Sequence, residues 1–368
     1  MNRLILILFI SIGAFAGCTS DEIDDKGVDL TNISYDPQPY DVELPDYFPD
    51  LYSPSDNPLT YDGVQLGRHL FYDPILSADS TMSCSSCHEP GLAFTDGLAT
   101  STGIDGIAGR RSSMSLINIG FFGNKLFWDG RSPSLEHQAL QPVEDPIELH
   151  ETWPNVERKL RSNERYRELF RKAFGIEYSG EITKELAGKA IAQFERILVS
   201  TNSRFDRERQ GKTFFTSEEQ DGFDMFFDDS GSGLPEAECG HCHNFPLFTT
   251  FEFFNNGLDS VSSLEDYEDK GLGEVTMYRF DNGKFKAPTL RNIELTAPYM
   301  HDGRFETLEE VLDHYATGGH PSPNVDPLVA AAGTRNLSEG QKRSIIAFLR
   351  TLTDTSYLQN PDVLSPFN

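Results

Sequence analysis

The sequence of 368 residues predicts a mainly α-helical protein with two domains, long loops and few short strands. The pentapeptide CxxCH occurs once in each half, as CSSCH at 84–88 and as CGHCH at 239–243. Each half also contains apolar residues at helical spacing behind residue pairs that begin helices. Runs that favour strands are short, namely TTFEFF at 249–254 and EVTMYRF at 274–280. We place the domain junction near 199–215.

Helical signals occur in both halves. In the first half, apolar residues repeat at helical spacing over 186–198 and over roughly 153–174. In the second half, three capping boxes mark helix starts, because a Ser or Thr is followed three residues later by Glu or Gln. These pairs are Thr216 with Glu219, Thr307 with Glu310, and Ser338 with Gln341.

The composition is that of a foldable, acidic chain. Hydrophobic residues make up 38% of the sequence, which is enough for a core, and the formal net charge is -27 at pH 7. This charge disfavours nucleic acid as a partner, because no basic surface would neutralise the phosphates. It is consistent with simple solubility and also with a basic protein partner.

The N-terminus resembles an export signal of the lipoprotein type over residues 1–17. Arg3 supplies a short positive region, and residues 4–15 form an apolar core that is too short to span a bilayer. An Ala-Gly pair precedes Cys18, which would become the lipidated first residue; alternatively, Cys18 lies within a signal that is simply removed. Residues 18–46 are typical of a flexible tether. We expect an exported protein, periplasmic or anchored to the cell envelope, with a lipid as its only membrane contact.

The CxxCH motif is typical of covalent haem attachment. Two thiols at this spacing reach the two vinyl groups of one porphyrin, and the following histidine reaches the iron. The predicted sets for two haem c groups are Cys84, Cys87 and His88 for the first and Cys239, Cys242 and His243 for the second. The alternatives are a disulfide, which leaves the histidine unexplained, and zinc, whose ribbons place their CxxC pairs only about 15–20 residues apart.

Longer segments around these motifs resemble the bacterial di-haem cytochrome c peroxidase family, which includes MauG. The segments are LGRHLFYDPILSADSTMSCSSCHEPGLAFTDG, STGIDGIAGRR, LFWDGRSPSLEHQALQPVEDPIE, FERILVSTNSRFDR and APTLRNIELTAPYMHDGRFETLEEVLDHY, and the resemblance runs from about 47 to 355. It implies two cytochrome c-like haem domains, a peroxidatic domain at 47–205 and an electron-transfer domain at 206–368. In that family, the first haem meets hydrogen peroxide and the second passes electrons to it.

The resemblance assigns roles to three residues. Trp128, in FWDGR, matches the family's tryptophan between the two haems, where a π-system can carry an electron. Glu148 matches the glutamate that takes a proton from peroxide and returns it during O–O cleavage. Gln138 matches the distal glutamine that bonds the bound oxygen. The alternatives are a packed aromatic residue, a solvated acid and a residue on a helix surface.

One position near the first haem departs from the family. Many members supply a histidine, from the loop after the first CxxCH, that blocks the iron until the enzyme is reduced. Ile104 takes this place in STGIDGIAG, and its side chain cannot ligate iron. We therefore expect the first haem to be five-coordinate as made and ready for peroxide without reductive activation.

A second departure concerns the second haem. High-potential peroxidases of the family place a methionine where this chain has Tyr315, whereas MauG is similar to this chain and uses a tyrosine as axial ligand. The positions that share one face of this helix are Leu308, Val311, Leu312 and Tyr315. A phenolate ligand would lower the potential of the haem relative to a thioether. A core tyrosine bonded to a carbonyl is the alternative, and His314 and Met300 are weaker rival ligands.

The resemblance also implies a calcium ion between the domains. Family members bind it with a loop asparagine and with carbonyl oxygens within TAPY. Thr296 and Pro298 match the carbonyl donors, but the asparagine position holds Ser112, a poorer oxygen donor. Because carbonyls and waters can complete a Ca²⁺ site, the sequence leaves calcium open.

Three functions are compatible with these residues. The first is reduction of hydrogen peroxide to water with electrons from a small redox protein, either a cytochrome c or a copper protein. The second is a MauG-like reaction, in which peroxide forms a high-valent di-haem state that oxidises aromatic residues of a partner protein. The third, a di-haem electron carrier, disagrees with Glu148, Gln138 and Ile104. The sequence favours an oxidoreductase of the cytochrome c peroxidase type and leaves open whether it forms a homodimer.

Overall fold

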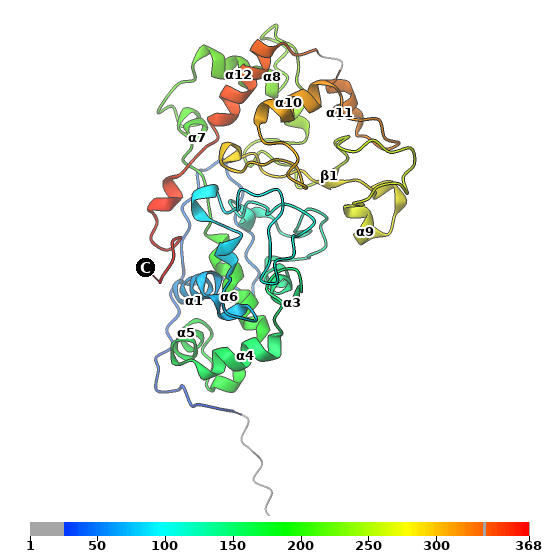
Figure 1. Cartoon of the computed structure of the whole chain (residues 1–368). Coiled ribbons are helices and arrows are strands. Elements are labelled where there is room, and N and C mark those ends of the chain that lie inside the picture. The colour runs from blue at the N-terminus through cyan, green and yellow to red at the C-terminus, as the bar shows by residue number, and fades with distance from the viewer. Residues whose placement is uncertain (1–25, 334–335, 368) are drawn as a thin grey trace, which may run out of the picture.

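The computed structural model describes residues 26–333 and 336–367. The predicted signal peptide at 1–17 and Cys18 lie outside the described residues. The described chain forms two lobes that stack along the long axis of the molecule (Figure 1). Among the described residues, no helix is long and apolar enough to cross a membrane.

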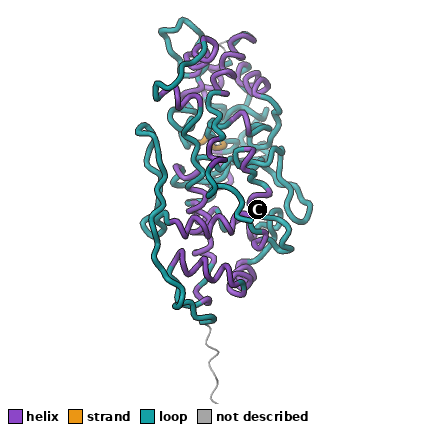
Figure 2. The backbone as a smooth tube through the Cα atoms, turned by 90° about the vertical axis from the view of Figure 1, so that its left-hand side faces the viewer, coloured by secondary structure: helices purple, strands orange, loops and turns teal. Residues whose placement is uncertain are grey.

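Helices dominate the described residues, which confirms the predicted mainly α fold. The first lobe contains α1 Tyr61–Tyr72, α2 Leu135–Gln138, α3 Gln141–Glu144, α4 Trp153–Ser162, α5 Glu164–Phe174 and α6 Lys184–Arg196. The remaining helices are α7 Arg204–Arg209, α8 Ser217–Phe226, α9 Leu272–Thr276, α10 Leu308–Ala316, α11 Pro327–Ala332 and α12 Glu339–Arg350. Two short strands, β1 Phe253–Phe254 and β2 Phe285–Lys286, pair antiparallel in the loop-rich middle of the molecule (Figure 2).

Two predicted elements differ from the structure. The run at 274–280 is not a strand: it begins within α9, and Met277 and Tyr278 are 86% and 57% exposed. Because no sheet covers these side chains among the described residues, the packing on which β-propensity depends is absent. The predicted helix over 153–174 is two helices, because Asn163 has an extended backbone and its side chain caps α5.

The three predicted capping boxes begin α8, α10 and α12. In each box the hydroxyl of the N-cap residue accepts from the backbone N–H three residues later, and the Glu or Gln side chain accepts from the N-cap N–H. The box of Thr307 and Glu310 therefore fixes where α10 begins and which face of that helix carries Tyr315.

Each lobe has its own apolar core. In the first lobe, α1 and α4 to α6 enclose a cluster that includes Leu66, Tyr166 and Ile191. In the second lobe, α8, α10 and α12 enclose a cluster rich in aromatic rings, in which the ring centroids of Phe226 and Phe348 are 5.2 Å apart. The two cores hold the helices against which the loops of the site are positioned.

Each lobe also contains a pair of helices that cross at a glycine. In the first lobe, α1 crosses α6 where a Cβ atom on Gly67 would lie 1.9 Å from the carbonyl oxygen of Ala190. In the second lobe, α8 crosses α12 where a Cβ atom on Gly222 would lie 2.0 Å from that of Ser344. Only glycine permits these approaches. Both glycines precede the first cysteine of their CxxCH motif by 17 residues, so the lobes are two copies of one arrangement.

A second pair of equivalent positions connects the loops with these helices. Asn118 and Asn292 both have a left-handed backbone with a φ of 62°. The N–H of Asn118 donates to a carbonyl just after α6, and the N–H of Asn292 donates to a carbonyl just after α12. Ser112 and Lys286 each lie six residues before their asparagine and are therefore equivalent positions in the two lobes.

Both ends of the described chain pack on the first lobe. Leu30 is 3% exposed, and its N–H donates to a carbonyl of that lobe 2.8 Å away. The described part of segment 18–46 thus contacts the first lobe at Leu30, while most of its other residues are exposed, and the flexible tether stays a prediction. Beyond α12 the chain returns to the first lobe, where Tyr357 and Val363 are buried in its core (Figure 1). The junction near 199–215 stays a prediction.

Candidate functional site

The first cavity adjoins the CSSCH motif. A 3₁₀-helix, Cys84–Ser86, presents the motif, and the cavity has a volume of about 480 Å³. The predicted residues in its wall are Cys84, Cys87, His88, Trp128, Gln138 and Glu148. The structure thus brings together all the residues that the sequence assigns to the first haem.

Hydrogen bonds hold the imidazole of His88 in the orientation that an iron ligand needs. Its Nδ1 lies 2.8 Å from the carbonyl oxygen of Phe94, so that Nδ1–H donates. The hydroxyl of Ser113 lies 3.2 Å from the same nitrogen and donates to the carbonyl of Cys87. Desolvation lowers the pKa of His88. The neutral ring therefore has Nε2 free to bind a metal.

The polar side chains that line the same cavity include the predicted Gln138 and Glu148. Gln138 is the last residue of α2, and its Oε1 is buried without a hydrogen-bond partner among the described residues. Glu148 follows α3, lines the cavity and is exposed to solvent. Desolvation by the surrounding protein and then the charge of Asp145 raise the pKa of Glu148 to about 7. A carboxyl group with this pKa exchanges protons near neutral pH.

The loop that carries Ile104 packs beside Glu148. The N–H of Ile104 donates to the backbone carbonyl of Glu148 over 3.0 Å. A Cβ atom on Gly103 would lie 1.9 Å from the carbonyl oxygen of Ile147, so the loop backbone lies tightly against this segment. Within the described parts of the chain, His88 is the only imidazole in the cavity wall. The coordination number of an iron at this position stays a prediction.

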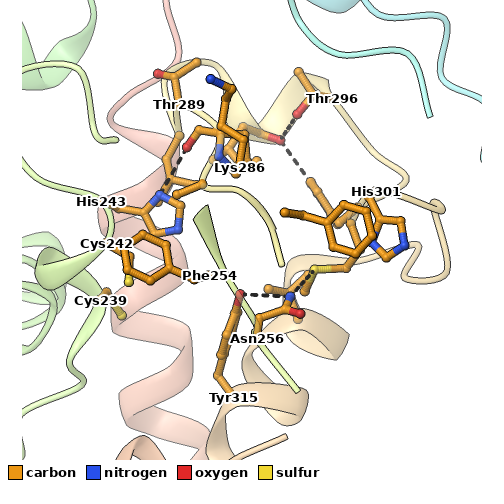
Figure 3. Close-up of a pocket in the computed structure, with 18 of the residues that line it drawn as sticks. Cys239, Cys242, His243, Phe254, Asn256, Lys286, Thr289, Thr296, His301 and Tyr315 are labelled. Atoms are coloured by element: carbon orange, nitrogen blue, oxygen red, sulfur yellow. Dashed lines mark hydrogen bonds between the residues drawn. The ribbon is translucent and has the colours of Figure 1, made fainter. Parts of the chain in front are cut away.

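The second cavity adjoins the CGHCH motif and has a volume of about 250 Å³ (Figure 3). Cys239, Cys242 and His243 line it. The Nδ1 of His243 lies 3.2 Å from the carbonyl oxygen of Phe248 and 3.1 Å from that of Pro288. Desolvation lowers the pKa of His243 as well. Both CxxCH histidines are therefore neutral rings oriented by backbone carbonyls, with Nε2 left for a ligand bond.

Tyr315 projects from α10 into the second cavity (Figure 3). Its hydroxyl accepts a long hydrogen bond of 3.5 Å from Nδ2 of Asn256, and the same amide contacts Sδ of Met300 at 3.3 Å. The rival ligand His314 is not in the cavity wall, and its Nε2 lies 2.9 Å from the carbonyl of Asn256. Desolvation raises the pKa of Tyr315 to about 12. A phenolate at neutral pH would therefore need a cation beside it, such as a metal.

Trp128 lies between the two cavities and lines both. Its indole Nε1–H donates to the carbonyl oxygen of Ser112 over 3.0 Å. Its own carbonyl oxygen accepts from the N–H of Lys286 over 2.9 Å. Because Ser112 and Lys286 are equivalent positions of the two lobes, each lobe contributes one hydrogen bond that positions this residue.

The residues that the sequence assigns to calcium lie close together, but their hydroxyl groups are already engaged. Ser112, Thr296 and Pro298 all line the second cavity. The Ser112 hydroxyl donates to the carbonyl of Met300 at 3.0 Å, and the Thr296 hydroxyl donates to that of Ile293 at 3.2 Å. Over the described ranges, the one group of three potential metal ligands from His, Cys, Asp and Glu is elsewhere: Asp228, Glu238 and His241. Carbonyls and waters would have to provide a calcium site here.

Both cavities fit a haem. In each, two thiols precede an imidazole whose Nε2 is free, and the four cysteines are free thiols, so the structure does not support the disulfide alternative. None of the four belongs to a group of three metal ligands among the described residues, which disfavours zinc. The cavity walls also contain buried polar atoms without a hydrogen-bond partner among the described residues, including Oε1 of Gln138, Oε2 of Glu195 and Nζ of Lys286.

Comparisons with known proteins agree with this geometry. Residues 61–213 match the family model described as di-haem cytochrome c peroxidase. Methylamine utilization protein MauG of Methylorubrum extorquens is 36% identical over 305 residues, which cover 81% of this chain and 80% of that protein. This chain belongs to the di-haem cytochrome c peroxidase and MauG family. Cytochrome c551 peroxidase of Nitrosomonas europaea, another relative, is 35% identical over 316 residues, which cover 84% of this chain and 86% of that protein.

A solved structure extends the family likeness to the fold. A MauG-like protein associated with microbial copper homeostasis superposes with a TM-score of 0.79 and 35% sequence identity, covering 89% of this chain and 100% of its own. Members of the family are oxidoreductases with two haem c groups, so this chain is an enzyme with two haems. Relatives named MauG and relatives named peroxidase match it at similar identity.

Three residues of this family member were not found by sequence reasoning: Ser113, Asn256 and Lys286. Ser113 and Asn256 act through hydrogen bonds to His88 and Tyr315, and no motif marks them. The sequence does contain a signal for Lys286. It is the only acid or base in the run KAPTL at 286–290, which precedes the turn at Asn292, and a Lys among apolar residues is rarely buried without a partner.

Proposed function

We propose that this enzyme reduces hydrogen peroxide to water, with electrons that enter at the second haem and pass to the first. The reaction consumes two electrons and two protons for each peroxide and yields two waters. The observation that carries the proposal is the shared cavity of His88, Gln138 and Glu148, in which no second imidazole lies among the described residues. A haem on Cys84 and Cys87 would supply the redox-active iron at which peroxide binds.

Glu148 is the proton carrier in this proposal. Its pKa of about 7 means that a large share of the carboxyl groups is ionised at neutral pH. The ionised form accepts a proton from the near oxygen of peroxide and delivers it to the departing oxygen, which leaves as water. The hydrogen bond from the N–H of Ile104 to the Glu148 carbonyl positions the backbone for this transfer.

Gln138 positions the peroxide. Its Oε1 is unpaired and buried in the cavity wall, so an incoming O–H group can donate to it at little cost in lost protein contacts. The amide N–H of the same side chain can donate to the second oxygen. Gln138 and Glu148 together would orient the O–O bond before proton transfer.

Trp128 is the electron route in this proposal. It lines both cavities, and hydrogen bonds from both lobes hold it. An indole at this position supplies a π-system between the haems. Tyr315 would hold the iron of the second haem, because it is in the cavity wall, its hydroxyl has only a long hydrogen bond, and the Nε2 of His314 is bonded to a backbone carbonyl.

A second candidate is a MauG-like oxidation of aromatic residues in a partner protein. Tyr315 and Ile104 favour it. A tyrosinate ligand lowers the potential of the second haem, which suits storage of oxidising equivalents more than uptake of electrons from a cytochrome. In this case Trp128 would conduct a hole outward, and the partner would supply the two electrons that peroxide removes.

Steady-state and stopped-flow kinetics separate the two candidates. A peroxidase consumes peroxide with a reduced cytochrome c or copper protein at about 1–10³ turnovers per second. A MauG-like enzyme forms an oxidised state that such donors barely discharge but that a tyrosine- or tryptophan-containing protein substrate removes. If neither donor nor protein substrate discharges the peroxide-treated enzyme, both candidates are wrong.

The cellular setting belongs to the proposal as well. The sequence of residues 1–18 supports export with a lipid on Cys18, and mass spectrometry of the N-terminal peptide from membranes tests the modification. The position of Ser112, Thr296 and Pro298 in one cavity wall is compatible with a calcium ion held by carbonyls. Metal analysis of the dialysed holoprotein tests it, and sedimentation tests whether the enzyme is a homodimer.

A further inference from the structure

Lys286 is a buried cation without a counter-ion. It lies on β2, its side chain is 3% exposed, and its Nζ has no hydrogen-bond partner among the described residues. Glu252 and Asp129 are close enough to influence its pKa, but neither forms an ion pair with it. Buried ammonium groups are normally paired with an anion. A negative charge beside the ammonium group would therefore stabilise it, and the described protein does not supply one.

Aromatic rings lie beside the ammonium group. Its Nζ is 5.2 Å from the ring centroid of Phe122 in the first lobe and 5.0 Å from that of Phe253 on β1. Cation–π contacts of this kind offset only part of the cost of taking a charge out of water. Desolvation, followed by the charge of Lys125, lowers the pKa of Lys286 to about 8.

The cavity offers a source for the missing anion. Lys286 lines the second cavity, and Figure 3 shows it on the side of Thr289 and Thr296, away from Cys239 and Cys242. A haem attached through these cysteines has its vinyl-derived edge at the thiols. Its two propionate groups extend from the opposite edge of the porphyrin. The carboxylates of the haem would therefore lie on the side of the cavity where Lys286 is found.

We propose that Lys286 binds a propionate of the second haem and that this ion pair raises the reduction potential of that haem. The inference rests on the proposed haem in the second cavity. A propionate charge favours the ferric state, and a neighbouring ammonium that neutralises it favours the ferrous state. The N–H of Lys286 also donates to the carbonyl of Trp128, so the ion pair would fix the edge of the haem beside the residue between the cavities.

The test compares two lysines that face the same ring. Lys286→Met removes the proposed partner, whereas Lys125→Met is the matched control, because the Nζ of Lys125 is 5.8 Å from the Phe253 ring centroid but the residue is exposed and does not line the cavity. Spectroelectrochemical titration of each holoprotein measures both haem potentials. We expect Lys286→Met to lower the equilibrium constant for reduction of the second haem roughly tenfold, or about 59 mV for one electron.

Equal potentials of the second haem in the two variants would overturn the proposal. If Lys286→Met does not fold with two haems, the crystal structure of the native holoprotein decides instead. A propionate oxygen within about 4 Å of the Lys286 Nζ, the range of an ion pair, supports the proposal, and a greater separation overturns it. The pyridine haemochrome of the native protein tests the underlying function separately, since fewer than two haems per chain contradicts that function whatever Lys286 does.

Discussion

Replacing Glu148 by glutamine removes the proposed proton carrier while keeping the size of the side chain. The amide cannot accept a proton from peroxide, so the contribution of general acid–base catalysis is lost. Such contributions are about 10²–10⁴-fold, which corresponds to about 2.7–5.4 kcal/mol in the activation free energy at about 1.36 kcal/mol per tenfold. The hydrogen bond from Ile104 involves the backbone carbonyl of Glu148, so the substitution leaves the loop in place.

The pKa of Glu148 adds a signature in the pH profile. Because desolvation raises this pKa to about 7, the carboxyl is mostly protonated below neutral pH and mostly ionised above it. The ionised form is the base, so the rate of peroxide consumption should rise as the pH increases through about 7 and then level off. About two pH units below that point, roughly 1% of the carboxyl groups are ionised, and the rate should fall about 100-fold. This inflexion should vanish in Glu148→Gln.

Stopped-flow mixing of the diferric enzyme with peroxide measures both effects over a range of pH. Glu144→Gln is the matched control. Glu144 is the exposed last residue of the neighbouring helix α3 and lies outside the cavity wall, so this substitution makes the same chemical change away from the site. The control should keep both the native rate and the inflexion. A native rate with an inflexion near pH 7 in Glu148→Gln would show that another group carries the proton.

Three further predictions concern ligation, electron transfer and stability. Tyr315→Met should raise the potential of the second haem by about 59 mV or more and change its optical spectrum; an unchanged spectrum rules out Tyr315 as a ligand. Trp128→Phe should slow oxidation of the second haem after peroxide addition by about tenfold or more, measured by stopped-flow absorbance; a native rate excludes the indole as the route. Asp206→Asn should lower the unfolding free energy by about 3–5 kcal/mol in urea melts, because it breaks a fully buried ion pair with Arg291 at 2.9 Å; the exposed control Asp221→Asn should change it by less than about 0.5 kcal/mol, and equal losses contradict the argument.

Local signals in the sequence predicted the parts of this molecule that depend on near neighbours. The CxxCH motifs place two thiols and an imidazole within five residues, and their local geometry is repeated in both lobes. The capping box of Thr307 and Glu310 set the start of α10 and hence the direction of Tyr315. The run at 274–280 was misassigned because its β-propensity depends on a neighbouring sheet that the fold does not provide.

The parts that sequence reasoning missed depend on contacts between distant segments. Asn256 reaches the Tyr315 hydroxyl across 59 residues of sequence, and Lys286 meets Phe122 only because the two lobes join there. The sharing of Trp128 by both cavities is likewise a property of the assembled lobes. The internal repeat was also hidden, because Gly67 and Gly222 are single residues whose equivalence is visible only at the helix crossings.

Electron paramagnetic resonance of the purified diferric holoprotein tests the central claim most directly, namely that the first haem has an open iron beside Gln138 and Glu148. The cavity wall holds no imidazole other than that of His88 among the described residues, so we predict that one of the two ferric haems is high-spin and that added peroxide abolishes its signal. Two low-spin haems, both unaffected by peroxide, would contradict the account.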